Sequence, residues 1–189
     1  MTASERKGHD MTSNARTADR ILGSLGSADG VGVLRIEDRL DIGIDELWAA
    51  LTDTRRLARW YGEVEGELRA GGGFRARLYA SGWEGTGRVE ECEPPRRFLV
   101  VSKALDEPNE DSTEVTLTHH GGQTMLVVEQ RGLPLDLLWA YGAGLQIHVE
   151  DLAAYIAGHE RGDPRTRFAE LEPAYRGLAA KVSLPGEKM

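Results

Sequence analysis

The stretch GWEGTGRVEECEPPRRF, residues 82–98, combines three glycines, a proline pair and an arginine pair around an apolar tryptophan and valine. The three glycines let a strand bend, because glycine accepts backbone angles that other residues avoid. The proline pair at 94–95 then stiffens the exit from that strand, since proline cannot donate to a central ladder of hydrogen bonds. The stretch therefore predicts a strongly curved strand that ends at a rigid corner.

Strands on either side of this stretch are predicted by two-residue alternation and by the turn residues between runs. Residues 34–42 alternate apolar and charged positions, which is typical of a half-buried strand. Turn signals such as AGGG at 70–73 and HHGGQT at 119–124 separate the later runs. We expect further strands at 63–69, 73–80, 83–92, 97–104, 112–119 and 123–131, which makes about seven in all.

Helical spacing of apolar residues predicts the remaining elements. Residues 13–25 indicate a short helix, which GSADGVG links to the first strand. Two short helices follow that strand, the first with Asp45 at its N-cap. Residues 136–159 predict one long amphipathic helix. A last helical segment at 166–181 is expected to be split by Pro173.

Consecutive antiparallel strands followed by one long helix exclude a parallel doubly wound sheet, because no crossover helices separate the strands. The predicted fold class is α+β, with a curved antiparallel sheet covered by a long C-terminal helix. We expect a disordered tail at 1–12, a short helix and linker at 13–30, the main domain at 31–160 and a helical extension at 161–189.

Composition narrows the possible partners and the compartment. The chain has 189 residues, a formal net charge of −8 and a single cysteine, Cys92. The negative charge and the lack of a basic stripe argue against nucleic acid and anionic membrane surfaces as partners. A lone cysteine fits a reducing cytoplasm. No apolar run reaches the length of a membrane span and no signal peptide is evident, so we expect no membrane insertion.

Two stretches, IDELWAALTDTRRLARWYG at 44–62 and GGGFRARLYASGWEGTGRVEECEPPRRFLVVSK at 71–103, resemble a known family. A tryptophan helix ending in W-Y, a glycine-rich turn and a G-x-V-x-E-x-x-P-P-R-R corner are similar to the bacterial branch of the activator of heat-shock-protein-90 ATPase homologue family. This branch belongs to the START-like (SRPBCC) superfamily, which is related to the birch-pollen allergen. The resemblance covers about residues 33–160. It implies the helix-grip fold and an internal cavity that commonly binds lipids or other hydrophobic small molecules.

Residues that could line such a cavity follow from alternation. In FRARLY, Phe74, Ala76 and Leu78 share one face of their strand, and we favour this face as the inward one. Aromatic residues are further candidates for the wall or mouth. The alternative is that these side chains simply fill the core. The expected ligand-binding residues are Trp60, Phe74, Ala76, Leu78, Trp83, Trp139, Tyr141, Leu145 and His148.

His148 lies seven residues after Tyr141 and seven before Tyr155, so the three side chains should lie along one flank of the long helix. A histidine between two tyrosines could act as a general base or bind a ligand. The alternative is a histidine that is packed in the core or at an interface. If the chain is an enzyme, the catalytic candidates are His148, Tyr141 and Arg77.

No metal and no cofactor are expected. His119 and His120 are adjacent on a strand, so their side chains point to opposite faces and do not form a chelating pair. The glycines of GSLGSADG, residues 23–30, lack both the phosphate-loop lysine and the dinucleotide spacing.

Three functions remain open. The favoured one is a noncatalytic carrier or sensor of a small hydrophobic or lipid-like ligand, which predicts an apolar cavity of roughly 300–1,000 Å³. The second, suggested by the superfamily, is a cyclase or hydratase acting on a polyketide-like substrate in the same cavity. The third is a protein-interaction or chaperone-cofactor module, which predicts a filled interior. The extension at 161–189 could cap the cavity or contact a second subunit in a homodimer.

Overall fold

The glycine-rich stretch forms strand β5 (Glu84–Glu93), a corner and the start of β6 (Arg97–Ala104) in a computed structural model that describes residues 20–182. A register shift between Val89 and Glu91 marks an irregularity of the bulge type in β5. A bulge bends the strand that carries it. The predicted curvature is present, and the bulge lies within this stretch.

Gly85 and Gly87 contribute to the curved strand in a different way from the predicted one. A Cβ atom at Gly85 would lie 2.4 Å from the ring of Trp83, and a Cβ atom at Gly87 would lie 2.4 Å from the ring of Phe74. These two glycines make room for aromatic rings that lie across the strand. Gly82 instead has a left-handed φ of 67° and supplies the turn before it.

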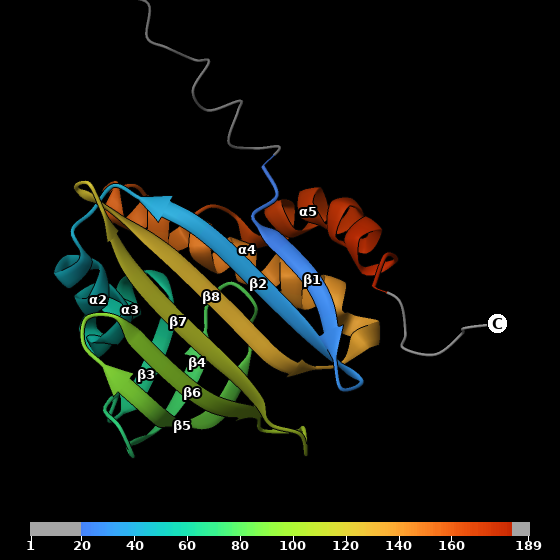
Figure 1. The fold of residues 1–189 in the computed structure, drawn as a ribbon, viewed down its shortest axis with the longest axis horizontal. Coiled ribbons are helices and arrows are strands. Elements are labelled where there is room, and N and C mark those ends of the chain that lie inside the picture. Colours follow the sequence, from blue (N-terminus) through green and yellow to red (C-terminus); the bar gives the residue numbers. More distant parts are fainter. Residues whose placement is uncertain (1–19, 183–189) are drawn as a thin grey trace, which may run out of the picture.

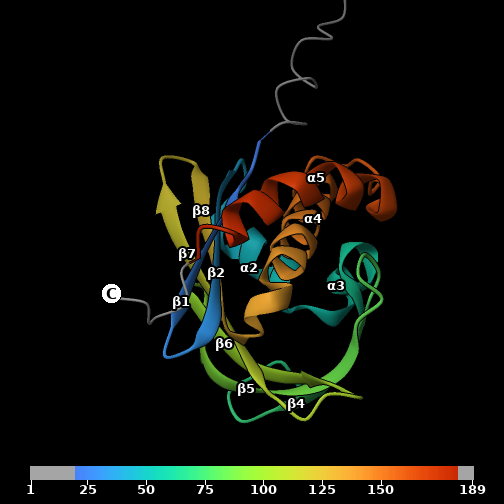
Figure 2. The ribbon, with the colours of Figure 1, turned by 90° about the vertical axis from the view of Figure 1, so that its right-hand side faces the viewer.

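The sheet has eight antiparallel strands in the order β1-β2-β8-β7-β6-β5-β4-β3, and it curves around the long helix (Figure 1 and Figure 2). This is the predicted α+β helix-grip architecture, with eight strands in place of about seven. The remaining strands are β1 (Gly23–Ala28), β2 (Val31–Leu40), β3 (Gly62–Gly66), β4 (Gly73–Leu78), β7 (Asp111–His120) and β8 (Gln123–Leu133).

Helices occupy the concave side of the sheet, as Figure 2 shows. Two short helices follow β2, a 3₁₀ turn precedes the long helix, and one further helix ends the described chain. None of the helices within residues 20–182 has the length and apolarity that a membrane crossing needs. The helices are α2 (Ile44–Thr52), α3 (Thr54–Trp60), η1 (Leu135–Leu137), α4 (Leu138–Ile156) and α5 (Pro164–Ala179).

The short helix expected at 13–25 is wrong where the structure tests it. Its first residues, like the tail at 1–12, lie outside the described residues, but Gly23–Ala28 form strand β1 and pair with β2. Asp29 and Gly30 join the two strands with φ values of 53° and 81°. Positive φ at both central residues is the geometry of the tight hairpin turn that Asp-Gly favours. The turn chemistry therefore outweighed a helical spacing that extended over too few residues.

Two details of the expected helices also differ. Gly43, rather than Asp45, occupies the N-cap of α2, and Asp45 lies in the first turn. Pro173 does not split α5, which is continuous around it. Proline removes the hydrogen bond to the carbonyl four residues earlier, here Ala169. Both residues are exposed, so water can take that bond.

The core has two parts that lie on opposite sides of α4. The larger part packs α2, α3 and α4 against the concave face of the sheet, around Leu34, Ile36 and Leu126. The smaller part lies between α4 and α5, around Ile147 and Tyr175. Helix α4 is therefore sandwiched between the sheet and α5 (Figure 2).

Candidate functional site

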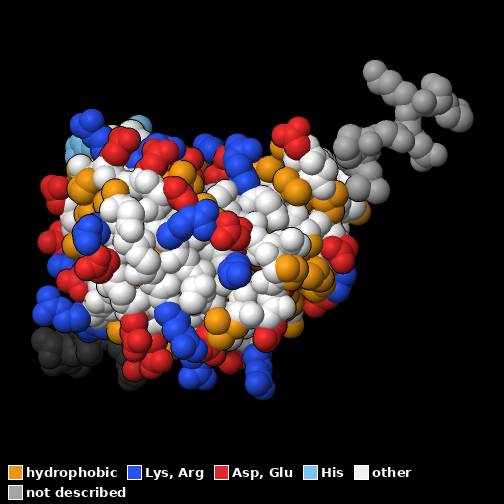
Figure 3. All heavy atoms as spheres, turned by 90° about the horizontal axis from the view of Figure 1, so that it is seen from below, with side chains coloured by type: hydrophobic (Ala, Val, Ile, Leu, Met, Phe, Trp, Pro, Cys, Tyr) orange, Lys and Arg blue, Asp and Glu red, His pale blue; other side chains and the backbone are white. Residues whose placement is uncertain are grey.

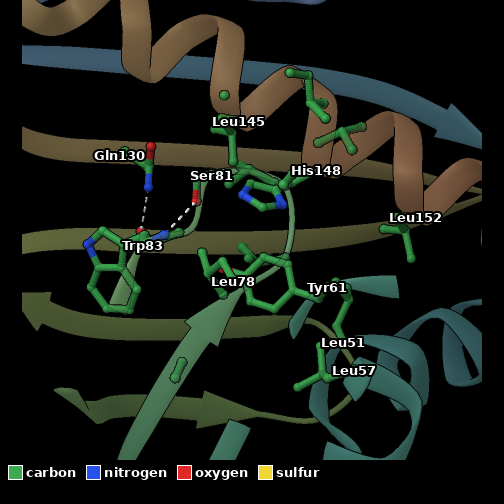
Figure 4. A pocket seen from close by; sticks show the side chains of 18 of the residues that line it. Leu51, Leu57, Tyr61, Leu78, Ser81, Trp83, Gln130, Leu145, His148 and Leu152 are labelled. Atoms are coloured by element: carbon green, nitrogen blue, oxygen red, sulfur yellow. Dashed lines mark hydrogen bonds between the residues drawn. The ribbon is translucent and has the colours of Figure 1, made fainter. Parts of the chain in front are cut away.

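A cavity of about 770 Å³ lies between the concave face of the sheet and helices α2, α3 and α4. The N-terminal part of α5 and the turn between β4 and β5 also reach it. Figure 4 shows side chains from helices and strands pointing toward one another across this space. Most of the lining is apolar, and it includes Leu51, Leu57, Val100, Val115, Leu126 and Leu152.

The structure places nearly all the expected ligand-binding residues on the wall of this cavity, the exception being Trp139. The inward face of β4 carries Ala76, which is 3% exposed, while the alternate residues Arg75 and Arg77 face outward. Contact of these residues with a ligand stays a prediction. The residues on the wall are Trp60, Phe74, Ala76, Leu78, Trp83, Tyr141, Leu145 and His148.

Trp139 lies outside the cavity, contrary to expectation. Its ring packs 6.0 Å from the ring of Phe168, and the guanidinium of Arg176 lies 3.5 Å from its centroid. Residues two apart on a helix are about 200° apart around its axis, so Trp139 and Tyr141 face opposite sides. Helix α5, which was not part of the family resemblance, covers the side of Trp139.

The three catalytic candidates do not converge. Arg77 is exposed on the outer face of β4, where it pairs with Glu63 and Glu84 in register. Tyr141 and His148 border the cavity. Tyr155, the last member of the expected line, is not among the residues that line the cavity, since it lies about 21 Å along α4 from Tyr141. Tyr155 instead lies 5.5 Å from the guanidinium of Arg59.

His148 is the most deeply buried ionisable group that borders the cavity. Its side chain is 7% exposed, and its Nδ1 atom is buried without a hydrogen-bond partner among the described residues. The ring lies edge-on to Tyr61, with 5.0 Å between centroids. Burial, with a smaller contribution from the positive charge of Arg161, lowers the pKa of His148 to about 4. The imidazole is therefore uncharged at neutral pH.

Tyr61 is a cavity residue that sequence reasoning missed. It follows α3 directly, and burial raises its pKa to about 12, with a further contribution from the negative charge of Asp111. The neutral phenol therefore persists throughout the physiological range. The W-Y pair that ends α3 was a usable signal, because Trp60 and Tyr61 both turn toward the same space.

The polar end of the cavity, which we define as Ser102, Asp111, Thr113, Gln130 and Tyr141, contains four residues that sequence reasoning missed, all except Tyr141. Strand register brings the first four together. Ser102 pairs with Asp111 across β6 and β7, and Thr113 pairs with Gln130 across β7 and β8. Alternation along β7 put Asp111 and Thr113 on one face, but only the register with both neighbours identifies that face as concave.

Two internal hydrogen bonds order the polar end. The Ser102 hydroxyl donates to Asp111 Oδ1 at 3.3 Å, and Gln130 Nε2 donates to Thr113 Oγ1 at 3.1 Å. Burial raises the pKa of Asp111, and Glu107 adds to the rise. The pKa of Tyr141 is raised by burial and by the negative charges of Glu107 and Asp111. These directions indicate a partly dehydrated site with negative potential.

The described residues show no cluster of side chains that could bind a metal ion. Within residues 20–182, no three His, Cys, Asp or Glu side chains gather as the ligands of a metal ion would. The thiol of Cys92 has a pKa raised by burial, which does not favour the thiolate needed for metal binding or nucleophilic attack.

Comparison with solved structures identifies several similar folds. The crystal structure of CalU16 from Micromonospora echinospora has a TM-score of 0.70 and 27% identity, with 84% of this chain and 98% of CalU16 covered. DynU16, a protein in the dynemicin biosynthetic locus, has a TM-score of 0.64 and 28% identity over 72% of this chain and 51% of DynU16. The protein encoded by BPP1335 from Bordetella parapertussis, at 23% identity over 83% of this chain and 92% of its own, has a TM-score of 0.63 and shows the fold alone.

Family comparison gives the same assignment as the fold. No curated protein sequence matches the chain. Residues 41–157 match the family of the activator of Hsp90 ATPase homolog 1-like protein, and they include α2, α3, strands β3 to β8 and α4. With the curved sheet closed around α4, the chain therefore belongs to the activator of Hsp90 ATPase homolog 1-like family within the START-like (SRPBCC) superfamily of helix-grip proteins.

Proposed function

We propose that this protein binds a small hydrophobic or lipid-like ligand in the cavity between the sheet and α4, as a noncatalytic carrier or sensor. The observation that carries the proposal is the cavity itself. Its volume of about 770 Å³ lies within the roughly 300–1,000 Å³ of sites for drug-sized ligands. Its lining is mainly apolar, as such sites are. A core of close-packed side chains would leave no comparable space.

Gly144 supports this proposal from the helix side. A Cβ atom there would meet nothing within 4 Å, and the residue lines the cavity. Glycine in a helix interior is less stable than alanine by about 1 kcal/mol. The sequence thus places an unfavourable helix residue where a larger side chain would reduce the space for a ligand.

The protonation states favour binding over acid–base catalysis. A general base works best when its pKa lies near the working pH, whereas that of His148 is lowered to about 4. The phenol of Tyr61, with its pKa raised to about 12, is a hydrogen-bond donor rather than a base. Arg77 lies outside the cavity. None of these groups is poised for proton transfer at neutral pH.

A second candidate is an enzyme of the cyclase or hydratase kind with a polyketide-like substrate. It is favoured by one observation, that Asp111, Tyr141 and His148 all border the same cavity. The similar protein DynU16 belongs to a biosynthetic locus, which is compatible with a catalyst or with a carrier of an intermediate. The two candidates differ in one measurable outcome, since only an enzyme would release a ligand chemically changed.

The protein-interaction alternative receives less support. It predicted a filled interior, and the described interior contains the cavity. On the face shown in Figure 3, acidic and basic side chains lie between small groups of hydrophobic ones. The large hydrophobic side chains that are exposed include Val31, Tyr79, Leu105 and Leu137. A homodimer stays a prediction, as does a location in the cytoplasm, which rests on the single cysteine.

Native mass spectrometry of freshly purified protein, followed by extraction into organic solvent, tests the proposal directly. We expect a bound compound, or else saturable binding of the neutral apolar dye Nile red. Gly144→Leu should narrow the cavity and weaken dye binding while the protein stays folded. Gly177→Leu is the matched control, because a Cβ there also meets nothing within 4 Å but lies on an exposed position of α5.

Equal dye binding by the wild-type protein, Gly144→Leu and Gly177→Leu would place the dye elsewhere and contradict the proposal. The absence of any bound compound together with no dye binding would do the same. Thermal unfolding of each variant shows whether lost binding reflects a narrowed cavity or an unfolded chain.

A further inference from the structure

We propose that the ligand of this cavity carries a protonated amine on an apolar body, and that the amine lies against Asp111 at the polar end. This inference rests on the proposed function and adds the chemistry of the ligand and its orientation. It is argued from the distribution of polar groups, their unused hydrogen-bonding capacity and the local charge.

The concave face of the sheet is divided sharply along its strands. The pairs Ser102–Asp111 and Thr113–Gln130 stand side by side near the loop that joins β6 and β7. The next inward residues along the same strands are apolar, with Val115 paired to both Phe98 and Val128. A ligand that fills the cavity therefore meets polar groups at one end and apolar groups along the rest.

The polar end retains unused hydrogen-bonding capacity. Asp111 uses Oδ1 to accept from Ser102, and its second carboxylate oxygen has no hydrogen bond to another described residue. The Tyr141 hydroxyl likewise has no hydrogen bond within residues 20–182. A carboxylate can only accept hydrogen bonds when it is ionised. Asp111 and Tyr141 are half-buried, so a ligand that donates hydrogen bonds can use these acceptors.

The charge at the polar end favours a cation over an anion. Asp111 and Glu107 both contribute negative potential there, as the raised pKa of Tyr141 indicates. His148, further along the cavity, is uncharged at neutral pH. Arg165 lines the cavity on the side formed by α5 and is positively charged, but its side chain is exposed. A ligand carboxylate or phosphate at the polar end would therefore face like charge in a partly dehydrated site.

Aromatic rings also lie near the polar end. Tyr141 reaches the polar end from α4, and Trp83 lies across Gly85, which pairs with Ala104 only two residues beyond Ser102. Figure 4 shows the indole of Trp83 at the same end of the cavity as Gln130. Ammonium groups are attracted to the faces of aromatic rings, most strongly to tryptophan. A carboxylate beside aromatic rings thus matches an amine better than it matches a neutral hydroxyl.

Three probes that share a dodecyl chain test the preference for a head group. Dodecylamine, dodecanol and dodecanoate each compete with Nile red for binding to the intact protein at neutral pH. We expect dodecylamine to displace the dye at about a tenfold lower concentration than dodecanol, since hydrogen bonds to charged groups are stronger than neutral ones. Dodecanoate should be the weakest. In Asp111→Asn, dodecylamine should displace the dye no better than dodecanol does.

Glu114→Gln is the matched control for the loss of one negative charge. Glu114 lies on the same strand but on its outer face, where it accepts from Arg97 Nε at 2.8 Å. We expect this variant to keep the order of the three probes. The order in which the three probes displace the dye from the wild-type protein tests the proposal even if Asp111→Asn fails to fold, because it requires no variant.

The outcomes separate the inference from the proposed function. If Nile red binds in the cavity and the three probes compete equally, or dodecanoate competes best, the proposal of an amine ligand is contradicted. The proposal that the cavity binds a ligand is not. The same holds if Asp111→Asn is folded and keeps the preference for the amine. If neither the dye nor any probe binds, the proposed function itself fails.

Discussion

His148 and Asp151 show how burial acts on single residues of one helix. The two side chains are 7% and 5% exposed, and each is disfavoured in its charged form. For the histidine this lowers the pKa to about 4, and for the aspartate it raises the pKa to about 6. The two groups therefore give the free energy of unfolding opposite dependences on pH.

His148→Gln isolates the first of these dependences. The unfolded chain binds a proton at His148 near the ordinary pKa of 6.5, but the folded chain does so only near 4. The wild-type protein therefore loses stability as pH falls between these values, by up to roughly 3 kcal/mol. We expect the variant to gain stability relative to the wild type over that interval. Urea unfolding at several pH values measures the difference, and a constant difference would contradict it.

Asp151→Asn should behave in the opposite sense. Because the folded chain holds the Asp151 proton up to a pKa of about 6, wild-type stability rises as pH is lowered toward the ordinary pKa of 3.8. The variant should therefore be most stable relative to the wild type at neutral pH, with its advantage shrinking in acid. An advantage that grew as the pH fell would rule out a raised pKa.

At the scale of elements, α4 separates the cavity from α5, and the packing on its two sides differs. Gly142 faces α5, where a Cβ atom would lie 2.4 Å from the ring of Tyr175. Gly144 faces the cavity, where a Cβ atom would meet nothing. The same residue type, two positions apart, permits close helix packing on one side and open space on the other.

Alanine at these two positions should have opposite effects on stability. Gly144→Ala should raise the free energy of unfolding by about 1 kcal/mol, the difference in helix propensity. Gly142→Ala should lower it, because overpacking destabilises by about 1–3 kcal/mol and exceeds that gain. Urea unfolding of both variants measures the pair, and changes of the same sign would contradict the assignment of the two faces.

A buried network joins β1, α4 and α5. Gln146 is fully buried, and its Oε1 accepts from the Tyr175 hydroxyl at 2.7 Å and from the Leu22 amide at 3.0 Å. The Tyr175 hydroxyl in turn accepts from the Gly23 amide at 3.1 Å. Leu22, Gly23 and Tyr175 lie outside the region matched by the family, whereas Gln146 lies within it, so the network fixes the added strand and helix to α4.

Tyr175→Phe tests that network. The change keeps the ring against Gly142 but removes two hydrogen bonds, which leaves the Gly23 amide short of a partner. We expect a loss of about 1–3 kcal/mol in the free energy of unfolding, with Nile red binding unchanged because the network lies on the far side of α4 from the cavity. A stability equal to that of the wild type would show that water satisfies these groups equally well.

For the molecule as a whole, an occupied cavity should stabilise the folded chain. A ligand that binds only the folded state at a hundred times its dissociation constant raises the free energy of unfolding by about 2.7 kcal/mol. We expect this from the tightest probe of the dodecyl series, measured by thermal shift, and we expect Gly144→Leu to lack it. A shift in Gly144→Leu equal to that of the wild type would place the probe outside the cavity.

Patterns in the sequence determined most of the architecture. The strand alternation, the proline corner and the 136–159 stripe are local features, and local propensities specified the strands, the long helix and the α+β class. The strand at Gly23–Ala28, which was wrongly predicted to be partly helical, could also have been recognised locally, since Asp29–Gly30 is a hairpin signal in the sequence. Faces of single strands, such as that of Phe74, Ala76 and Leu78, could also be assigned from alternation.

Only the tertiary structure decided what those faces enclose. The polar end requires three strands in a particular register, and no single segment reveals that Ser102, Asp111 and Gln130 meet. Trp139 was misplaced because the covering helix lies beyond the stretch that resembles the family. Whether space is filled depends on the summed volumes of side chains from distant segments. For that reason periodicity indicates which residues point inward, but the cavity exists only once the sheet has closed around α4.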